Sequence, residues 1–217
     1  PAGTADVIET MTPVNLSLEK IKEVVQKEGG CMAWGGAVKL SPVDDVIISV
    51  EKALDVDSAG QMIASVLSKK AAAGSTHVVI DIPVGETAKV RTKEEAFLLE
   101  YYLRAVGLAI RMEVEVLITD GSQPVGRGIG PALEAMDVLS VLRNEPGAPA
   151  DLKERAVQLA GLMLEKAGAE PGGKGKDRAL EILESGLALE KFYRICEAQG
   201  GFTEPAPAPL QHDILAV

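Results

Sequence analysis

Two spacings of hydrophobic residues alternate along this chain, and together they predict helices interleaved with strands. Three runs are largely apolar and rich in β-branched residues, which is typical of strands buried in a parallel sheet. Helical segments lie between these runs and after them. We therefore expect an α/β fold in three layers, α/β/α, with a mostly parallel sheet. The expected strands are residues 45–50, 76–84 and 114–119.

The helices are marked by residues that favour helix ends. Ser17 is a good N-cap for residues 18–28, and Gly29–Gly30 stops that helix. Thr92 and Glu95 form the sequence signature of a capping box. The expected helices are residues 18–28, 58–73, 93–109, a helix after Gly130, and residues 151–167, 177–185 and 187–198.

The helices after residue 130 can either pack onto the sheet or form a small satellite. We expect one α/β domain over residues 1–200. Residues 201–217 contain TEPAPAPLQHDILAV, whose prolines predict an extended tail leading to a further domain. The chain opens at Pro1, within PAGTAD, rather than at a methionine, so we expect it to be a piece of a longer polypeptide.

Composition excludes several classes of function. Of the 217 residues 47% are hydrophobic, which is ample for a core, and the net charge is −10. Such a charge, without a long basic run, argues against nucleic-acid binding. No apolar run approaches ~20 residues and no signal peptide is visible, so we expect no membrane partner. Cys31 and Cys196 fit no metal spacing and are expected to be buried thiols, which favours a cytoplasmic location.

Candidate binding residues gather in DSAGQMIASVLSKK and the strand that follows it. Ser65 and Lys69 are one turn apart, so they share a helix face. Lys89 follows the second expected strand, at the sheet edge where α/β proteins bind ligands. Each has an ordinary alternative: Lys69 is a solvated lysine near a helix C-terminus, Lys89 is part of a charged loop, and Asp57 is an N-cap.

A glycine cluster, Gly126, Gly128 and Gly130, separates the last expected strand from a helix. Its amides could cradle an anion at the helix N-terminus, or the cluster could be a tight turn without a ligand. It matches neither the dinucleotide fingerprint nor a P-loop. His77 begins a strand, where a structural role is expected, and His212 lies in the tail, so a hydrolytic triad has little support. His, Cys and carboxylate residues do not cluster as a metal site requires.

Four blocks in order give the chain a family resemblance. They are PAGTADVIETMTPV, GGCMAWGGAVKLSPVDD, DVDSAGQMIASVLSKKAAAGSTHVVIDIPVG and TDGSQPVGRGIGPALEAMDVL. The chain resembles the thymidine/pyrimidine-nucleoside phosphorylase family, and within it the archaeal-type AMP phosphorylase branch. The resemblance implies the central α/β part of an enzyme about twice this length, with a nucleoside phosphorylase/phosphoribosyltransferase-like catalytic domain. An upstream helical domain would supply part of the phosphate site, so the chain alone is expected to have little activity.

The resemblance also implies roles for individual residues. Thr4 would contact the nucleotide, and Asp57 would donate a proton to the leaving base. Ser65 and Lys89 would bind the nucleotide. Ser65 and Lys69 match the serine and lysine that hold the base in the pyrimidine-specific branch. The partners are then a nucleotide or nucleoside and inorganic phosphate, with phosphate as co-substrate, no cofactor and no metal, in a homo-oligomeric parent enzyme.

The implied reaction is phosphorolysis of an N-glycosidic bond. Pyrimidine-specific relatives have an arginine where this chain has Val50, which favours the AMP-type reaction, AMP plus phosphate giving adenine and ribose 1,5-bisphosphate. One alternative is a thymidine or pyrimidine-nucleoside phosphorylase domain. Others are a non-catalytic folded fragment and the related phosphoribosyltransferase chemistry, for which no acidic metal pair is visible.

Overall fold

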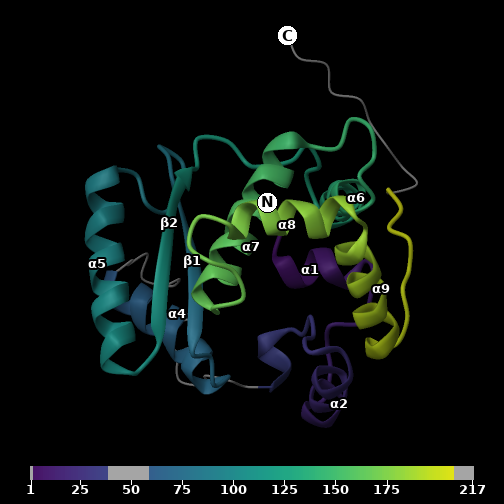
Figure 1. The fold of residues 1–217 in the computed structure, drawn as a ribbon, viewed down its shortest axis with the longest axis horizontal. Coiled ribbons are helices and arrows are strands. Elements are labelled where there is room, and N and C mark those ends of the chain that lie inside the picture. Colours follow the sequence, from purple (N-terminus) through teal and green to yellow (C-terminus); the bar gives the residue numbers. More distant parts are fainter. Residues whose placement is uncertain (1, 39–58, 208–217) are drawn as a thin grey trace. The chain divides into compact units, whose positions relative to one another are not determined.

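The computed structural model describes residues 2–38 and 59–207, which form two compact units (Figure 1). Unit 1 contains Pro1–Ala37, Val125–Lys153 and Leu183–Val217, and unit 2 contains Val38–Pro124 and Glu154–Ile182. Each unit has its own hydrophobic core. The predicted strand at residues 45–50 lies outside the described residues, and the predicted boundary at residue 200 stays a prediction.

The observed elements follow the sequence pattern closely. In chain order they are α1 (Thr4–Glu9), α2 (Leu18–Glu28), the 3₁₀ helix η1 (Gly35–Val38), α4 (Ala59–Ala72), β1 (His77–Val84), α5 (Lys93–Ala109), β2 (Glu113–Asp120), α6 (Pro131–Leu142), α7 (Ala150–Lys166), α8 (Gly175–Glu184) and α9 (Leu187–Gln199). The helices α1 and η1 are too short to show a helical period in the sequence, and no pattern predicts them.

The predicted helix ends are formed by the residues that predict them. The Ser17 hydroxyl accepts a hydrogen bond from the Lys20 amide at 3.2 Å, and Gly29 ends α2 with a left-handed φ of 78°. At α5 the Thr92 hydroxyl accepts from the Glu95 amide, and the Glu95 carboxylate accepts from the Thr92 amide. This reciprocal pair is a capping box, so that prediction is confirmed.

Unit 2 is built on a parallel pair of strands. In β1 and β2, His77 lies opposite Glu113 and Val84 lies opposite Asp120, with α5 connecting the two strands. Alternate strand residues point to one face and pack against α4 and α5, where α5 lies beside β2 (Figure 1). That core contains Ile63, Leu67, Val78, Ile82, Leu99, Leu103, Val114 and Val116.

The other face of the same strands meets α7. Asp81 and Glu115 point away from the α4–α5 core, and they pair with Arg155 and Lys166 of α7. Within unit 2 the described residues therefore form helix, sheet and helix layers. The predicted α/β class with a parallel sheet is confirmed.

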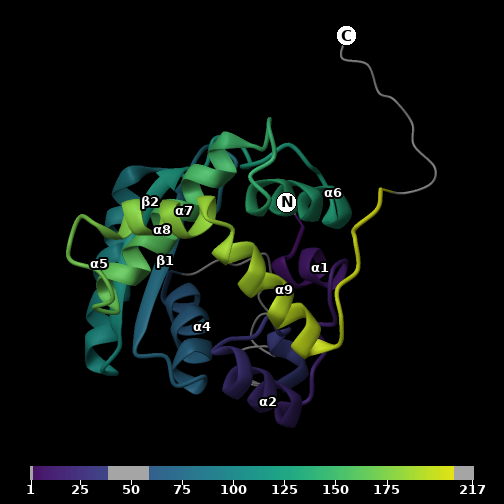
Figure 2. The same cartoon turned by 45° about the vertical axis from the view of Figure 1, so that its right-hand side comes forward.

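Backbone contact joins α7 to α8. A Cβ built on Gly161 would lie 2.5 Å from the Lys176 amide nitrogen and 2.7 Å from the Lys176 Cα atom. A Cβ on Gly175 would collide with the Gly161 carbonyl oxygen. Figure 2 shows the two helices together beside β1. Only glycine allows the two backbones to approach this closely.

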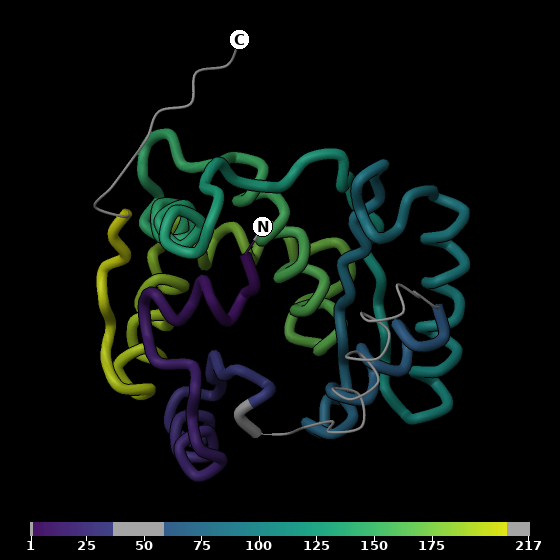
Figure 3. The backbone as a smooth tube through the Cα atoms, turned by 180° about the vertical axis from the view of Figure 1, so that it is seen from behind, coloured from purple at the N-terminus to yellow at the C-terminus, as the bar shows by residue number. Residues whose placement is uncertain are grey.

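Unit 1 is helical, and its core joins distant parts of the chain. Val7 and Met11, at the N-terminal end, pack with Ala135 and Leu139 of α6 and with Cys196 of α9. After Gly200 the chain runs back alongside α9, as Figure 3 shows. There Phe202 stacks edge-on against Tyr193 with ring centroids 4.8 Å apart.

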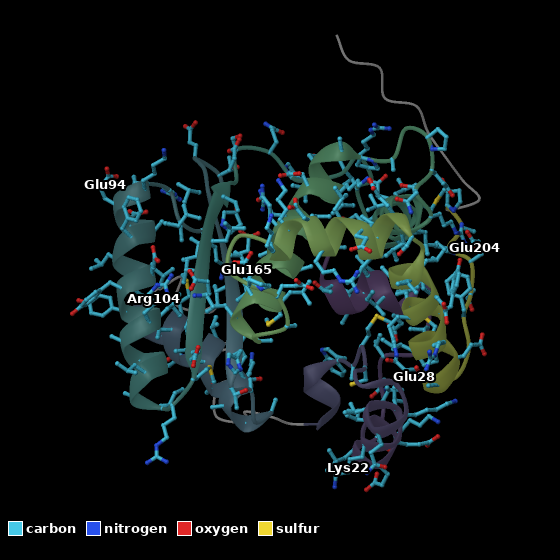
Figure 4. The ribbon with its side chains drawn as sticks, viewed as in Figure 1. Lys22, Glu28, Glu94, Arg104, Glu165 and Glu204 are labelled. Atoms are coloured by element: carbon cyan, nitrogen blue, oxygen red, sulfur yellow. The ribbon has the colours of Figure 1, made fainter. Side chains whose placement is uncertain are left out.

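Two buried polar side chains bind α9 to the segment around α2. Gln199 is 3% exposed and accepts a hydrogen bond from the Met32 amide at 2.6 Å, while its amide group donates to the Pro13 and Met32 carbonyls. Glu28 faces α9 and pairs with Lys191 at 3.3 Å and Arg194 at 3.0 Å (Figure 4). These contacts leave both buried side chains hydrogen-bonded, as the low polarity of an interior requires.

Both cysteines are free thiols. Cys196 is fully buried and Cys31 is half-buried, and burial raises the pKa of each. The expected burial is therefore confirmed for Cys196 and only partial for Cys31. In the part of the chain that the structure describes, no helix has both the length and the apolar composition that a membrane crossing needs.

One ion-pair network predicts how stability depends on pH. Arg104 of α5 binds Glu115 at 2.7 Å, and Lys166 binds the second oxygen of this carboxylate, also at 2.7 Å. The hydrogen bond from Arg104 lowers the pKa of Glu115, and the hydrogen bond from Lys166 lowers it further. Burial alone would raise this pKa, but the two hydrogen bonds outweigh it. A carboxylate with a lowered folded-state pKa adds stability above its unfolded pKa of about 4.3, and this is lost as pH falls through the folded value.

We therefore expect the free energy of unfolding to fall more steeply below about pH 4.3 in the wild type than in Glu115→Gln. Urea unfolding at a series of pH values measures the free energy of unfolding of the wild type and of the variant. Glu113→Gln is the matched control, because Glu113 is the exposed first residue of the same strand. Parallel pH profiles for wild type and Glu115→Gln would contradict the expectation.

Candidate functional site

The loop after β1 holds Lys89 at the carboxyl edge of the sheet. Val90 forms a bridge with Val84, the last residue of β1, and the Gly85 amide donates to the Val90 carbonyl at 3.2 Å. The loop is therefore closed on itself, and Lys89 lies beside the end of the strand with an exposed side chain. An exposed lysine at this edge can meet an anionic ligand as a point charge.

A second loop, after β2, packs directly on the first. A Cβ on Gly85 would lie 2.5 Å from the Gly121 carbonyl carbon, and a Cβ on Gly121 would lie 2.8 Å from the Pro83 Cβ. The Gly121 amide also donates to the Val84 carbonyl at 2.8 Å. Backbone contact between two glycines thus joins both loops at the carboxyl edge.

Below these loops three polar side chains form a network that links both strands to α7. Asp81 accepts a hydrogen bond from the Thr119 hydroxyl at 2.6 Å and one from Arg155 at 2.8 Å. Arg155 also donates to the Asp120 carbonyl at 3.0 Å. The Asp81 and Arg155 side chains are 23% and 17% exposed, so water screens this pair only partly.

Sequence reasoning missed this network because its members are distant along the chain. Thr119 and Arg155 are 38 and 74 residues from Asp81. One signal was present: Asp81 is the single charged residue in the apolar strand HVVIDIPV. A carboxylate at such a position needs a partner.

The predicted pair on α4 shares one face of that helix. Ser65 and Lys69 are one turn apart and both half-buried. The helix α4 leads through residues 73–76 into the first residue of β1, so Lys69 lies nearer the amino end of that strand than Ser65 does. Lys89 follows the opposite end of β1. The binding roles of these three residues stay predictions, and Asp57 and Val50 lie outside the described residues.

Thr4 belongs to unit 1, where it is the exposed first residue of α1. The segment before it is held to the start of α6 by one carboxylate. Glu134 accepts hydrogen bonds from the Ala2 amide at 2.8 Å and from the Gly130 amide at 3.1 Å, both on the same oxygen. Figure 2 shows α1 beside α6. Glu134 was not among the residues that sequence reasoning selected.

The glycine cluster before α6 is occupied by side chains of the protein itself. The Arg127 and Gly128 amides donate to one oxygen of Asp137, at 2.6 and 2.7 Å. The Gly126 amide donates to Asp151 at 3.1 Å. The amides that an external anion would need thus already donate to carboxylates of the protein. This geometry favours the alternative in which the cluster is a tight turn without a ligand.

Three curated relatives that the chain matches carry one name. No family model matches the chain. It is 63% identical over 209 residues, or 96% of its length, to a protein of Hahella chejuensis (strain KCTC 2396) named "Putative thymidine phosphorylase". It is 57% identical over 216 residues, its whole length, to proteins of the same name from Legionella pneumophila (strain Corby) and Parvibaculum lavamentivorans (strain DS-1 / DSM 13023 / NCIMB 13966). The chain spans about two fifths of the length of these curated relatives, between 41% and 43%.

Proposed function

We propose that this chain, as a homologue of proteins named thymidine phosphorylase, belongs to the thymidine/pyrimidine-nucleoside phosphorylase family and forms part of a pentosyltransferase. The observation that carries this proposal is identity of 57–63% over nearly the whole chain. Its parallel strands, and the lysine that follows one of them, fit a protein that binds its ligand at the carboxyl edge of a sheet.

In the proposed reaction a phosphate oxygen forms a bond to the anomeric carbon of the sugar while the N-glycosidic bond breaks. The electron pair of that bond moves to the base nitrogen. Asp57 supplies the proton that neutralises the leaving base, in the role of general acid. Thr4, Ser65, Lys69 and Lys89 bind the substrate, and phosphate is the co-substrate. Lysine side chains favour negative charge as it develops on the base.

A pyrimidine nucleoside is the substrate that the names of the relatives favour, so AMP becomes the second candidate. One observation supports a nucleoside 5′-monophosphate: Val50 replaces the arginine implied for pyrimidine-specific relatives. A 5′-phosphate adds about two negative charges, and exposed Lys89 can meet one of them.

The test is a phosphate-dependent assay with the protein that contains this chain. Thymidine, uridine, AMP and CMP are each incubated with and without phosphate, and released base is measured. Phosphate-dependent release from thymidine or uridine supports the main proposal. Higher kcat/KM for AMP or CMP supports the second candidate. No release from any of the four would favour a non-catalytic role.

Lys89→Ala tests whether the edge of the sheet carries the anionic contact. We expect a nucleotide substrate to lose roughly 1.5–3 kcal/mol of binding, seen as a higher KM, because hydrogen bonds to charged groups have this strength. Thymidine has no 5′-phosphate and should lose little. Lys93→Ala is the control, since Lys93 is exposed a few residues further on, at the start of α5. Equal losses in the two variants would contradict a specific role for Lys89.

A further inference from the structure

We propose that Glu134 is a positioning residue that fixes the place of Thr4 in the substrate site. This inference rests on the proposed function. One Glu134 oxygen accepts the Ala2 amide at 2.8 Å and the Gly130 amide at 3.1 Å, although Ala2 and Glu134 are 132 residues apart. Glu134 is therefore the polar link between the segment that carries Thr4 and the turn before α6.

The link is well suited to hold a backbone in place. Glu134 lies in the first turn of α6, where the helix dipole favours a negative side chain. Charge-assisted hydrogen bonds of this kind are roughly twice as strong as neutral ones. Behind the link, Val7 and Met11 pack against Ala135 and Leu139. The core fixes α1 as a whole, and Glu134 fixes the two residues that precede Thr4.

The other carboxylates at this turn have separate partners. Asp137 binds the Arg127 and Gly128 amides, and Asp151 binds the Gly126 amide. The turn therefore keeps these three hydrogen bonds when Glu134 is changed. The loss is confined to the Gly130 amide and to the segment that leads into Thr4.

Thr4 is placed to act on a ligand only if this segment is fixed. Its side chain is exposed at the first residue of α1, and Gly3, just before it, is the N-cap. Without the Ala2 bond, residues 2 and 3 lose their hydrogen bond to α6. A displacement of about 1 Å in a substrate-positioning group can cost on the order of 10²-fold in catalytic efficiency.

The experiment compares Glu134→Ala with Glu134→Gln in the protein that contains this chain. The glutamine oxygen can still accept both amides, whereas alanine cannot. Thr4→Ala and the double variant Thr4→Ala/Glu134→Ala complete a double-mutant cycle. Glu197→Ala is the control for lost charge, because Glu197 is exposed on α9 in the same unit. Each variant is measured for kcat, for KM and for amide hydrogen exchange in residues 2–9.

We expect Glu134→Ala to raise KM by about 10- to 100-fold, within the range of such displacements, with a smaller change in kcat. Exchange in residues 2–9 should rise, while Glu134→Gln and Glu197→Ala stay near wild type. The double variant should lose no more catalytic efficiency, kcat/KM, than Thr4→Ala alone, because Glu134 acts through Thr4. If Glu134→Ala does not fold, Glu134→Asp takes its place, since it keeps the charge and shortens the reach.

Two results would overturn the inference while the proposed function stands. One is an active Glu134→Ala variant with unchanged KM. The other is a double variant whose fold-loss in kcat/KM equals the product of the two single-variant losses, which would show that Glu134 and Thr4 act independently. A wild-type protein that releases no base from any nucleoside or nucleotide would overturn both the inference and the proposed function.

Discussion

Asp57→Asn is expected to lower kcat by about 10²–10⁴-fold, the usual contribution of a general acid. The base leaves as an anion unless a proton reaches it, and an amide side chain cannot supply that proton as a carboxylic acid does. Asparagine is also a good N-cap, so a helix that starts after residue 57 should keep its cap. The change separates the chemical role of Asp57 from its structural role.

The measurements are kcat and KM for the best substrate of the phosphate-dependent assay, with the midpoint of thermal unfolding as a check on folding. KM should stay within a few-fold of wild type, since a general acid acts in the transition state. Asp55→Asn is the matched control, because it makes the same change two residues away. Turnover close to wild type in Asp57→Asn would leave Asp57 as a cap only.

Gly161→Val should destabilise unit 2 by roughly 2–3 kcal/mol, the upper part of the range for overpacked positions. A Cβ at residue 161 would lie 2.5 Å from the Lys176 amide nitrogen and 2.7 Å from its Cα atom. Backbone atoms cannot rotate aside as a flexible side chain can. The helices α7 and α8 would have to separate, which also loosens the Arg155 and Lys166 pairs of α7.

Urea unfolding measures this loss as a lower midpoint. Gly60→Ala is the control, since Gly60 lies in α4 with no atom within 4 Å of an added Cβ, and alanine there favours the helix. Gly161→Ala should fall between the control and the valine variant. An unchanged midpoint in Gly161→Val would mean that α8 does not rest on α7 at this point.

Local signals in the sequence were sufficient to predict most elements. Ser17 and the pair Thr92 and Glu95 act as caps, because capping depends only on residues within one helical turn. The strand predicted at residues 114–119 is observed as Glu113–Asp120, one residue longer at each end. Short helices such as α1 escaped prediction, since six residues cannot establish a period.

The candidate site was less predictable, because its contacts join distant parts of the chain. The sequence indicated that Lys89 follows a strand, which is a local fact. It could not indicate that Arg155 of α7 pairs with Asp81, or that Glu134 reaches Ala2, since these depend on how the elements pack. The glycine cluster was ambiguous for the same reason, because nothing in the sequence shows that Asp137 fills its amides.

The contact between Gly85 and Gly121 limits how this protein can acquire a new specificity. Neither position can accept a side chain without pushing the two loops apart. Lengthening either loop at these glycines would also break the bond between the Gly121 amide and the Val84 carbonyl. Random mutagenesis aimed at the sheet edge should therefore return tolerated changes at residues 86–87 and 122–124, which are exposed, and almost none at the glycines. A library that varies those residues and keeps Gly85 and Gly121 would sample ligand contacts, and most of its variants should still fold.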